Sequence, residues 1–181
     1  GTTKDIPGGT IVRDAAGAPT GIFKDNAQGL IFDAIPDASP EMNARTLNAA
    51  MKYVAEQGVT SVAHMGTWGD LAVFERAHKA GTMITRISAA VPLSSWASLR
   101  DTVAARGRGD NWLQIGGLKG FADGSLGSHT AAMLLPYDDA PNVSGLLVTL
   151  SECLYELTAG AVKAGLHGMV HAIGDRASRI Q

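Results

Sequence analysis

The stretch LQIGGLKGFADGSLGSHT, residues 113–130, decides the fold class, because an apolar strand pattern in it runs directly into a long glycine-rich loop. The strand pattern closes on Lys119, where burial would penalise the charge of an amine. We expect a function to compensate for that penalty. The stretch therefore predicts a functional site at the carboxyl end of a buried strand.

A second strand end of the same kind follows in GMVHAIGDR, residues 168–176, where an apolar run closes on His171 just before a tight turn. In parallel α/β proteins the βα-loops converge at the carboxyl ends of the strands, and active sites are built there. Lys119 and His171 are therefore candidate metal ligands. We expect both side chains to point into one pocket at the same end of the sheet.

Between residues 40 and 181, helical and strand-like patterns alternate along the chain. Apolar residues from Leu47 to Ala55 share one helical face, and this helix ends at Gly58. The other predicted strands are 59–65, 84–93, 113–119 and 169–171, and the other helices are 71–80, 94–106 (opened by a serine cap) and 151–164. Such alternation predicts a parallel sheet with its strands in sequence order and right-handed connections. Four such strands make about half of an eight-stranded (β/α)₈ TIM barrel.

The first residues have a different pattern. Strand-like runs at 10–13 and 20–24 flank the turn-rich segment 14–19, which predicts a β-hairpin. Residues 36–40 follow as a linker, with Ser39 as the cap and Pro40 at the first position of the next helix. We therefore predict a small β insert with its linker over 1–39 and a partial barrel domain over 40–181.

The composition is that of an ordinary globular protein. The 181 residues are 45% hydrophobic and 18% charged, with a net charge of −2, which argues against nucleic acid or an anionic membrane surface as the partner. No apolar run is long enough to span a bilayer. Cys153, the single cysteine, fits a reducing compartment, and we expect it to pack in the protein core as part of a helix. We expect a cytoplasmic protein that acts on a small molecule, and we leave open whether it forms a homo-oligomer.

Several blocks of the chain resemble the amidohydrolase superfamily, specifically the metal-dependent hydrolase branch that contains N-substituted formamide deformylase and its YtcJ-like relatives. The blocks LKGFADGSLGSHTAA and HAIGDRA carry most of the resemblance. Further blocks agree with that branch in the same order: PGGTIVRD at 7–14, GIFKD at 21–25, GVTSV at 58–62 and the pair Pro136-Tyr137.

The resemblance implies a ligand set of which this chain holds only part. In the family, metal is bound by an HxH pair on the first barrel strand, a lysine or acidic residue on the fourth, histidines on the fifth and sixth, and an aspartate on the eighth. Lys119 matches the fourth-strand lysine and His171 the fifth-strand histidine. The sequence has no HxH and ends at Gln181, before the last two ligands. We therefore expect an incomplete fragment that is inactive alone.

The implied chemistry is hydrolysis of a non-peptide carbon–nitrogen bond by one or two divalent metals, with Zn²⁺ expected. Zn²⁺ lowers the pKa of bound water and polarises a carbonyl. Lys119 can be a ligand only as a carbamate, formed when its neutral amine takes up CO₂, since an ammonium has no lone pair. From the residues alone, Lys119 could instead reach solvent or pair with Asp123, and His171 could be a hydrogen-bonded core histidine.

The loop from Gly120 to Thr149 is long enough to be a lid or binding loop. Its glycine spacing matches neither GxGxxG nor GxxxxGK[ST], and GSLG is no GxSxG elbow. Asp175 is either a carboxylate that orients His171 or a helix N-cap. The residues that we expect to contact substrate or support the ligands are His64, Asp123, Ser125, His129, Tyr137 and Asp175.

The sequence thus favours a metal-dependent amide or formamide hydrolase. The alternatives are a non-catalytic α/β domain that binds a small molecule and lacks the full metal site, and a phosphate-binding fold, which the loop spacing disfavours.

Overall fold

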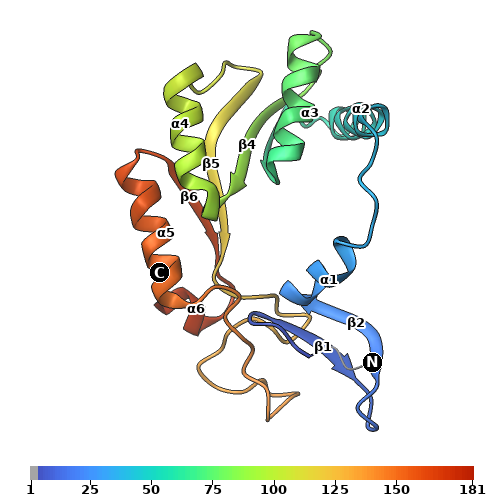
Figure 1. The fold of residues 1–181 in the computed structure, drawn as a ribbon, viewed down its shortest axis with the longest axis vertical. Coiled ribbons are helices and arrows are strands. Elements are labelled where there is room, and N and C mark those ends of the chain that lie inside the picture. The colour runs from blue at the N-terminus through green and yellow to red at the C-terminus, as the bar shows by residue number, and fades with distance from the viewer. Residues whose placement is uncertain (1–3) are drawn as a thin grey trace. The chain divides into compact units, whose positions relative to one another are not determined.

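Four strands form one sheet in the order β3-β4-β5-β6, as the alternation of helices and strands predicts. They are β3 (Ser61–Met65), β4 (Arg86–Pro92), β5 (Leu113–Phe121) and β6 (His167–His171) in a computed structural model that describes residues 4–181. The pairs β3/β4 and β4/β5 are parallel. A separate antiparallel hairpin, β1 (Gly9–Arg13) and β2 (Pro19–Asp25), precedes the sheet (Figure 1). The predicted fold class, a parallel half-barrel with an N-terminal hairpin, is confirmed.

The chain divides into two compact units. The first contains the described residues up to Pro36 together with Phe121–Tyr155 and Val170–Gln181, and the second contains Asp37–Gly120 and Glu156–Met169. The predicted boundary between an insert over 1–39 and a barrel domain over 40–181 stays a prediction.

Helices of the second unit begin where the sequence supplies caps. In α2 (Pro40–Glu56), the Ser39 side chain accepts a hydrogen bond from Met42 N at 3.2 Å and proline stands in the first turn, as predicted. In α3 (Trp68–Lys79), Thr67 and Asp70 form a reciprocal capping box. The buried side chains of these two helices are Leu47, Met51, Leu71 and Phe74. The core of this unit therefore lies between the helices and the strands beside them (Figure 1).

Two local predictions are wrong. Helix α4 (Trp96–Arg106) has no side-chain cap, because it continues a short 3₁₀ turn at Leu93–Ser95, and the Ser95 hydroxyl donates to Pro92 O at 2.7 Å instead. Cys153 is exposed on α5 (Ser151–Lys163), where Leu154 is the buried neighbour, so the helical face that meets the core is one residue further along.

A bulge in β5 decides which way Lys119 points. The register against β4 shifts between Ala89 and Ala90, so that Ala89 pairs with Ile115 but Ala90 pairs with Gly117, and Gly116 is the extra residue with φ +126°. Because strand side chains alternate, one extra residue moves every later side chain to the opposite face.

The register identifies the two faces. One face of the sheet carries Val62, His64, Ile87, Ala89, Val91, Leu113, Ile115 and, beyond the bulge, Leu118. Val62, His64 and Ile87 line a cavity with residues of α2 and α3, so this face meets the helices. Lys119 pairs with Pro92 and belongs to the other face. If Gly116 took a regular place in the alternation of side chains, the lysine would point into the helix layer.

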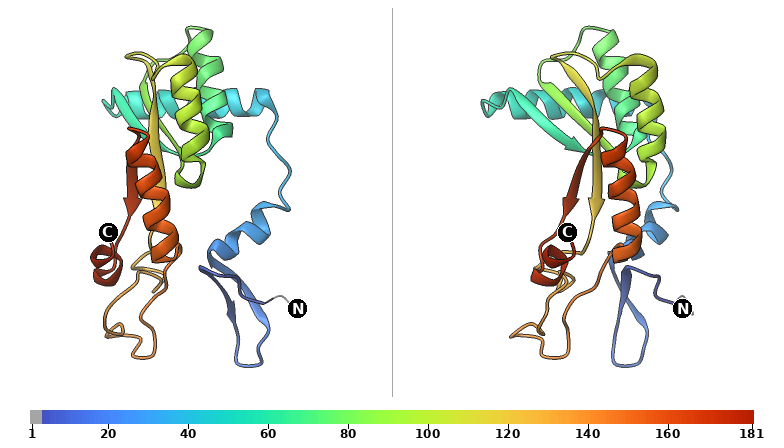
Figure 2. Two further views of the ribbon diagram at one scale, coloured as in Figure 1. Left: turned by 60° about the vertical axis from the view of Figure 1, so that its left-hand side comes forward. Right: turned by 90° about the vertical axis from the view of Figure 1, so that its left-hand side faces the viewer.

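Elements of the first unit are held together by the long loop. After β2 the chain continues through a 3₁₀ turn (Asn26–Gln28) and α1 (Gly29–Phe32). The Lys24 ammonium donates to Ser128 O at 2.7 Å, and Asn26 donates to Val148 O at 3.3 Å. The short C-terminal helix α6 (Asp175–Arg179) lies against the loop, with Arg176 N bonded to Ala132 O (Figure 2).

We predict that Gly116→Ala destabilises the chain by about 1–3 kcal/mol, because φ +126° is strained for any residue with a Cβ. Urea unfolding followed by circular dichroism measures the change. The matched control is Gly168→Ala in β6, where φ is ordinary and a Cβ meets open space. The control should be neutral or should stabilise by about 0.4–1 kcal/mol. Equal effects of the two substitutions would contradict the bulge argument.

Candidate functional site

His171 ends β6 and is tied to the chain that leaves β5. Its carbonyl accepts from Ala122 N at 2.8 Å, and its ring Nε2 lies 2.8 Å from Gly124 O. A carbonyl can only accept, so Nε2 carries the proton and Nδ1 keeps its lone pair. A hydrogen bond of this kind fixes the tautomer of a metal-binding histidine. The ring is therefore prepared to offer Nδ1 to a cation.

Asp123 is the buried anchor of this site. Its carboxylate accepts from the backbone N–H groups of Ala132 and Gly174 at 2.8 Å each and from Ile173 N at 3.0 Å. One oxygen lies 3.7 Å from His171 Nε2. The side chain thus joins the loop after β5 to the turn after β6, and it supplies negative charge beside the imidazole.

A cavity of 560 Å³ opens beside these residues. Its walls include Asp123, Gly124, Ser125 and His171 from the loop and from β6, together with Asp25 and Phe32 from the segment after the hairpin. The structure therefore brings together three of the residues that the sequence singled out, namely Asp123, Ser125 and His171. Ser125 also bonds Ser128 through their hydroxyls at 2.7 Å.

The remaining loop candidates hold the loop itself. His129 Nε2 lies 3.0 Å from Asp139, and its ring packs edge-on against Tyr137 at 4.6 Å. The Tyr137 hydroxyl donates to Ala131 O at 2.8 Å, and burial, followed by the charge of Asp123, raises the pKa of Tyr137 above its usual value. Their predicted contact with substrate stays a prediction.

Asp175 is not the N-cap of α6. The cap position of α6 is Gly174, and Asp175 stands in the first turn, where its Oδ1 accepts from Leu134 N and Arg176 N at 2.8 Å each. The aspartate therefore fastens the loop to α6. A role in orienting His171 stays a prediction, whereas Asp123 is the carboxylate that the structure sets 3.7 Å from that ring.

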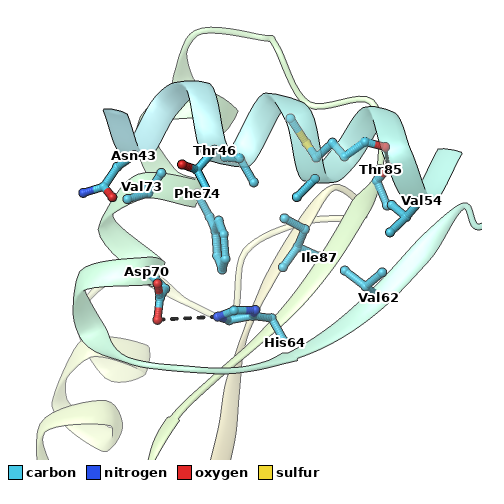
Figure 3. A pocket seen from close by; sticks show the side chains of 13 residues that line it. Asn43, Thr46, Val54, Val62, His64, Asp70, Val73, Phe74, Thr85 and Ile87 are labelled. Carbon is cyan, nitrogen blue, oxygen red and sulfur yellow. Dashed lines mark hydrogen bonds and ion pairs between the residues drawn. The ribbon is translucent and has the colours of Figure 1, made fainter. Parts of the chain in front are cut away.

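His64 lines a different cavity, of 210 Å³, inside the second unit (Figure 3). Its ring packs edge-on against Phe74 at 4.8 Å, and Nε2 lies 3.5 Å from Asp70 Oδ2. Figure 3 shows the Asp70 carboxylate directed toward the His64 ring, with Phe74 and Ile87 among the other side chains that line the cavity. The histidine faces α2 and α3, and its predicted contact with substrate is untested.

Lys119 lies on the sheet face opposite to the helices, and burial lowers its pKa below the ordinary value of 10.5. Lys119 and His171 belong to different units, so their predicted convergence on one pocket stays a prediction. Within residues 4–181, no group of three or more His, Cys, Asp or Glu side chains could hold a metal ion.

One carboxylate of the larger cavity was not singled out from the sequence. Asp25 ends β2 with φ +51°, and its Oδ2 is buried without a hydrogen-bond partner in the described part of the chain. The signal for Asp25 in the sequence is the change from a strand pattern to a turn directly after Lys24-Asp25.

Parallel strands that deliver a lysine and a histidine near their carboxyl ends, beside a long loop, are typical of a (β/α)₈ barrel, in which active sites are built at that end. The chain belongs to the amidohydrolase family, whose model matches residues 1–181. None of the helices in the described residues is both long and apolar enough to span a membrane.

Known relatives agree with this assignment. The protein LONG AFTER FAR-RED 3 of Arabidopsis thaliana is 36% identical over 97% of this chain and 32% of its own length. Putative amidohydrolase YtcJ of Bacillus subtilis (strain 168) is 35% identical over 97% of this chain and 34% of its own length. An uncharacterised metal-dependent hydrolase from Pyrococcus horikoshii OT3 superposes with a TM-score of 0.72 at 31% identity, over 85% of this chain and 32% of that one. The chain spans about a third of the length of these relatives.

We predict that Asp123→Asn destabilises the chain by about 1.5–3 kcal/mol. The amide loses the charge that strengthens three hydrogen bonds, and its NH₂ group meets a backbone donor in a buried place. Asp139→Asn on the exposed side of the same loop is the control and should change stability by less than about 0.5 kcal/mol. Urea unfolding of both variants measures the difference. Similar midpoints for the two would show that Asp123 is no anchor.

Proposed function

We propose that this chain is part of a metal-dependent hydrolase that cleaves a non-peptide carbon–nitrogen bond of the amide or formamide type. The observation that carries the proposal is the fixed tautomer of His171, whose Nε2 donates to Gly124 O and leaves Nδ1 for a cation. Membership of the amidohydrolase family and likeness to metal-dependent hydrolases support the reaction class.

Lys119 fits the second ligand position through its chemistry. Its pKa is lowered by burial, so the neutral amine that takes up CO₂ is reached at a lower pH than for a lysine in water. The amine and CO₂ give a carbamate and a proton, which converts a cation into an anionic oxygen donor. The bulge at Gly116 supports this role, since it takes the side chain out of the helix layer.

A divalent metal, with Zn²⁺ the expected ion, would be held by His171 and the Lys119 carbamate together with donors from other parts of the full-length protein. When bound, it supplies a polarised carbonyl and a water of lowered pKa. Asp123 keeps the imidazole in place and adds negative charge beside it. The glycine-rich loop and the 560 Å³ cavity would receive the substrate.

We predict that the 181-residue chain alone binds Zn²⁺ weakly and hydrolyses no amide, because two protein ligands leave most of a tetrahedral site to water. Isothermal titration with Zn²⁺ measures this, and His171→Ala should remove the weak binding that remains. Stoichiometric, tight zinc in the wild-type chain would mean that the ligands are misassigned.

In the full-length protein, Lys119→Ala should abolish metal-dependent amide hydrolysis, and propionate should restore part of it. A carbamate is a carboxylate on a long arm, so removal of the arm leaves room for a free carboxylate at the ligand position. Lys119→Arg should be inactive with or without propionate, because guanidinium stays charged and cannot take up CO₂.

The assay compares wild type and both variants with excess Zn²⁺, with and without bicarbonate and propionate. Near-normal activity of Lys119→Ala without additives would rule out the ligand role. Absence of hydrolysis in the metal-loaded wild type over a panel of amides and formamides would favour the non-catalytic small-molecule-binding alternative.

A further inference from the structure

The 560 Å³ cavity contains a carboxylate that no part of the proposed metal chemistry uses. Asp25 reaches it from the end of β2, and its Oδ2 is buried without a hydrogen-bond partner among residues 4–181. A buried acceptor without a donor costs about 1–3 kcal/mol, more when it is charged. Folded proteins rarely keep such a group unless something else pairs with it.

The backbone at Asp25 is also held in an unfavourable conformation. Its φ of +51° and ψ of −128° lie outside the regions that residues with a Cβ prefer. Strain of this kind persists where the surroundings impose it, and it concentrates at ligand sites. The carboxylate of this strained residue lines the cavity.

The neighbouring charges leave Asp25 available to a ligand. The Lys24 ammonium donates to Ser128 O at 2.7 Å. Asp123, the other carboxylate of the cavity, already accepts three backbone N–H groups. Two carboxylates therefore face one cavity, and only one of them has its hydrogen bonds satisfied by the chain.

The position of Asp25 relative to His171 links it to the proposed reaction centre. A Cβ built on Gly124 would lie 2.7 Å from Asp25 Oδ1, and the carbonyl of the same Gly124 accepts from His171 Nε2. The Asp25 carboxylate therefore lies beside Gly124, the residue whose carbonyl fixes the imidazole. Phe32 and Phe121, which are 62% and 46% exposed, give the cavity two aromatic walls.

We propose that Asp25 is a specificity-determining residue that binds the ammonium group of a small substrate whose apolar body packs against Phe32 and Phe121. An ammonium supplies both the N–H donors that Oδ2 lacks and a charge opposite to that of the two carboxylates. Aromatic walls suit the apolar part and favour a nearby cation. The proposal depends on the proposed hydrolase function in one respect, namely that the ammonium compound bound in the cavity is the substrate.

The test uses the full-length protein and two probes of equal size, benzylammonium chloride and benzyl alcohol, in isothermal titrations with metal-loaded and metal-stripped protein. Wild type should bind benzylammonium about tenfold more tightly than the alcohol. Asp25→Asn keeps the size and tolerates positive φ, so it should fold and lose this preference. The matched control is Asp138→Asn on the exposed loop, which should keep it.

Asp25→Gly separates binding from structure. If the carboxylate serves a ligand, removing it relieves backbone strain, so the unfolding midpoint should rise while the preference for ammonium disappears. A lower midpoint of Asp25→Gly, equal affinities of wild type for the two probes, or a preference kept by Asp25→Asn would each overturn the proposal. Because binding is read without turnover, these outcomes are distinct from a failure of the hydrolysis assay.

Discussion

The buried carboxylate of Asp123 is the constraint on which the first unit depends. Its three backbone donors come from two segments, the loop at Ala132 and the turn at Ile173 and Gly174, which are about 40 residues apart in the chain. A charged acceptor shut away from water must be satisfied fully, so neither segment can move without exposing it. The loop after β5 and the turn after β6 are therefore fixed to each other, and the wall of the cavity is fixed with them.

That rigidity gives the histidine its chemistry. Gly124 follows Asp123 directly, so a fixed Asp123 also fixes the carbonyl that accepts from His171 Nε2. A Cβ at position 124 would collide with the Thr130 side chain and lie 2.7 Å from Asp25 Oδ1, so this position favours glycine. One anchoring carboxylate thus fixes the carbonyl that determines the tautomer of a candidate ligand, and a second, unsatisfied carboxylate lines the same cavity.

The repeating architecture could be predicted from the sequence, because it is determined by the period of the hydrophobic residues and by the order of the elements along the chain. The strands around 61–65 and 113–119, the capped start at Ser39 and the hairpin all follow from local patterns. What could not be predicted depends on contacts distant in sequence. The approach of Asp123 to the His171 ring depends on the return of the loop to β6. The environment of the unpaired Asp25 oxygen depends on how the end of the hairpin meets that loop. The exposure of Cys153 depends on a rotation of its helix by one residue.

Because Gly116 is an extra residue in β5, the face on which Lys119 lies depends on how many residues of the strand take part in the regular alternation. Deletion of Gly116 would remove the bulge and leave Leu118 and Lys119 on their own faces, whereas one residue inserted into the regular part of the strand after the bulge would exchange the faces of the side chains that follow it. The strand can therefore lose its extra residue without changing which side chain meets the helices. Such an insertion would present a leucine to the site and a lysine to the helices, although every residue type had been kept.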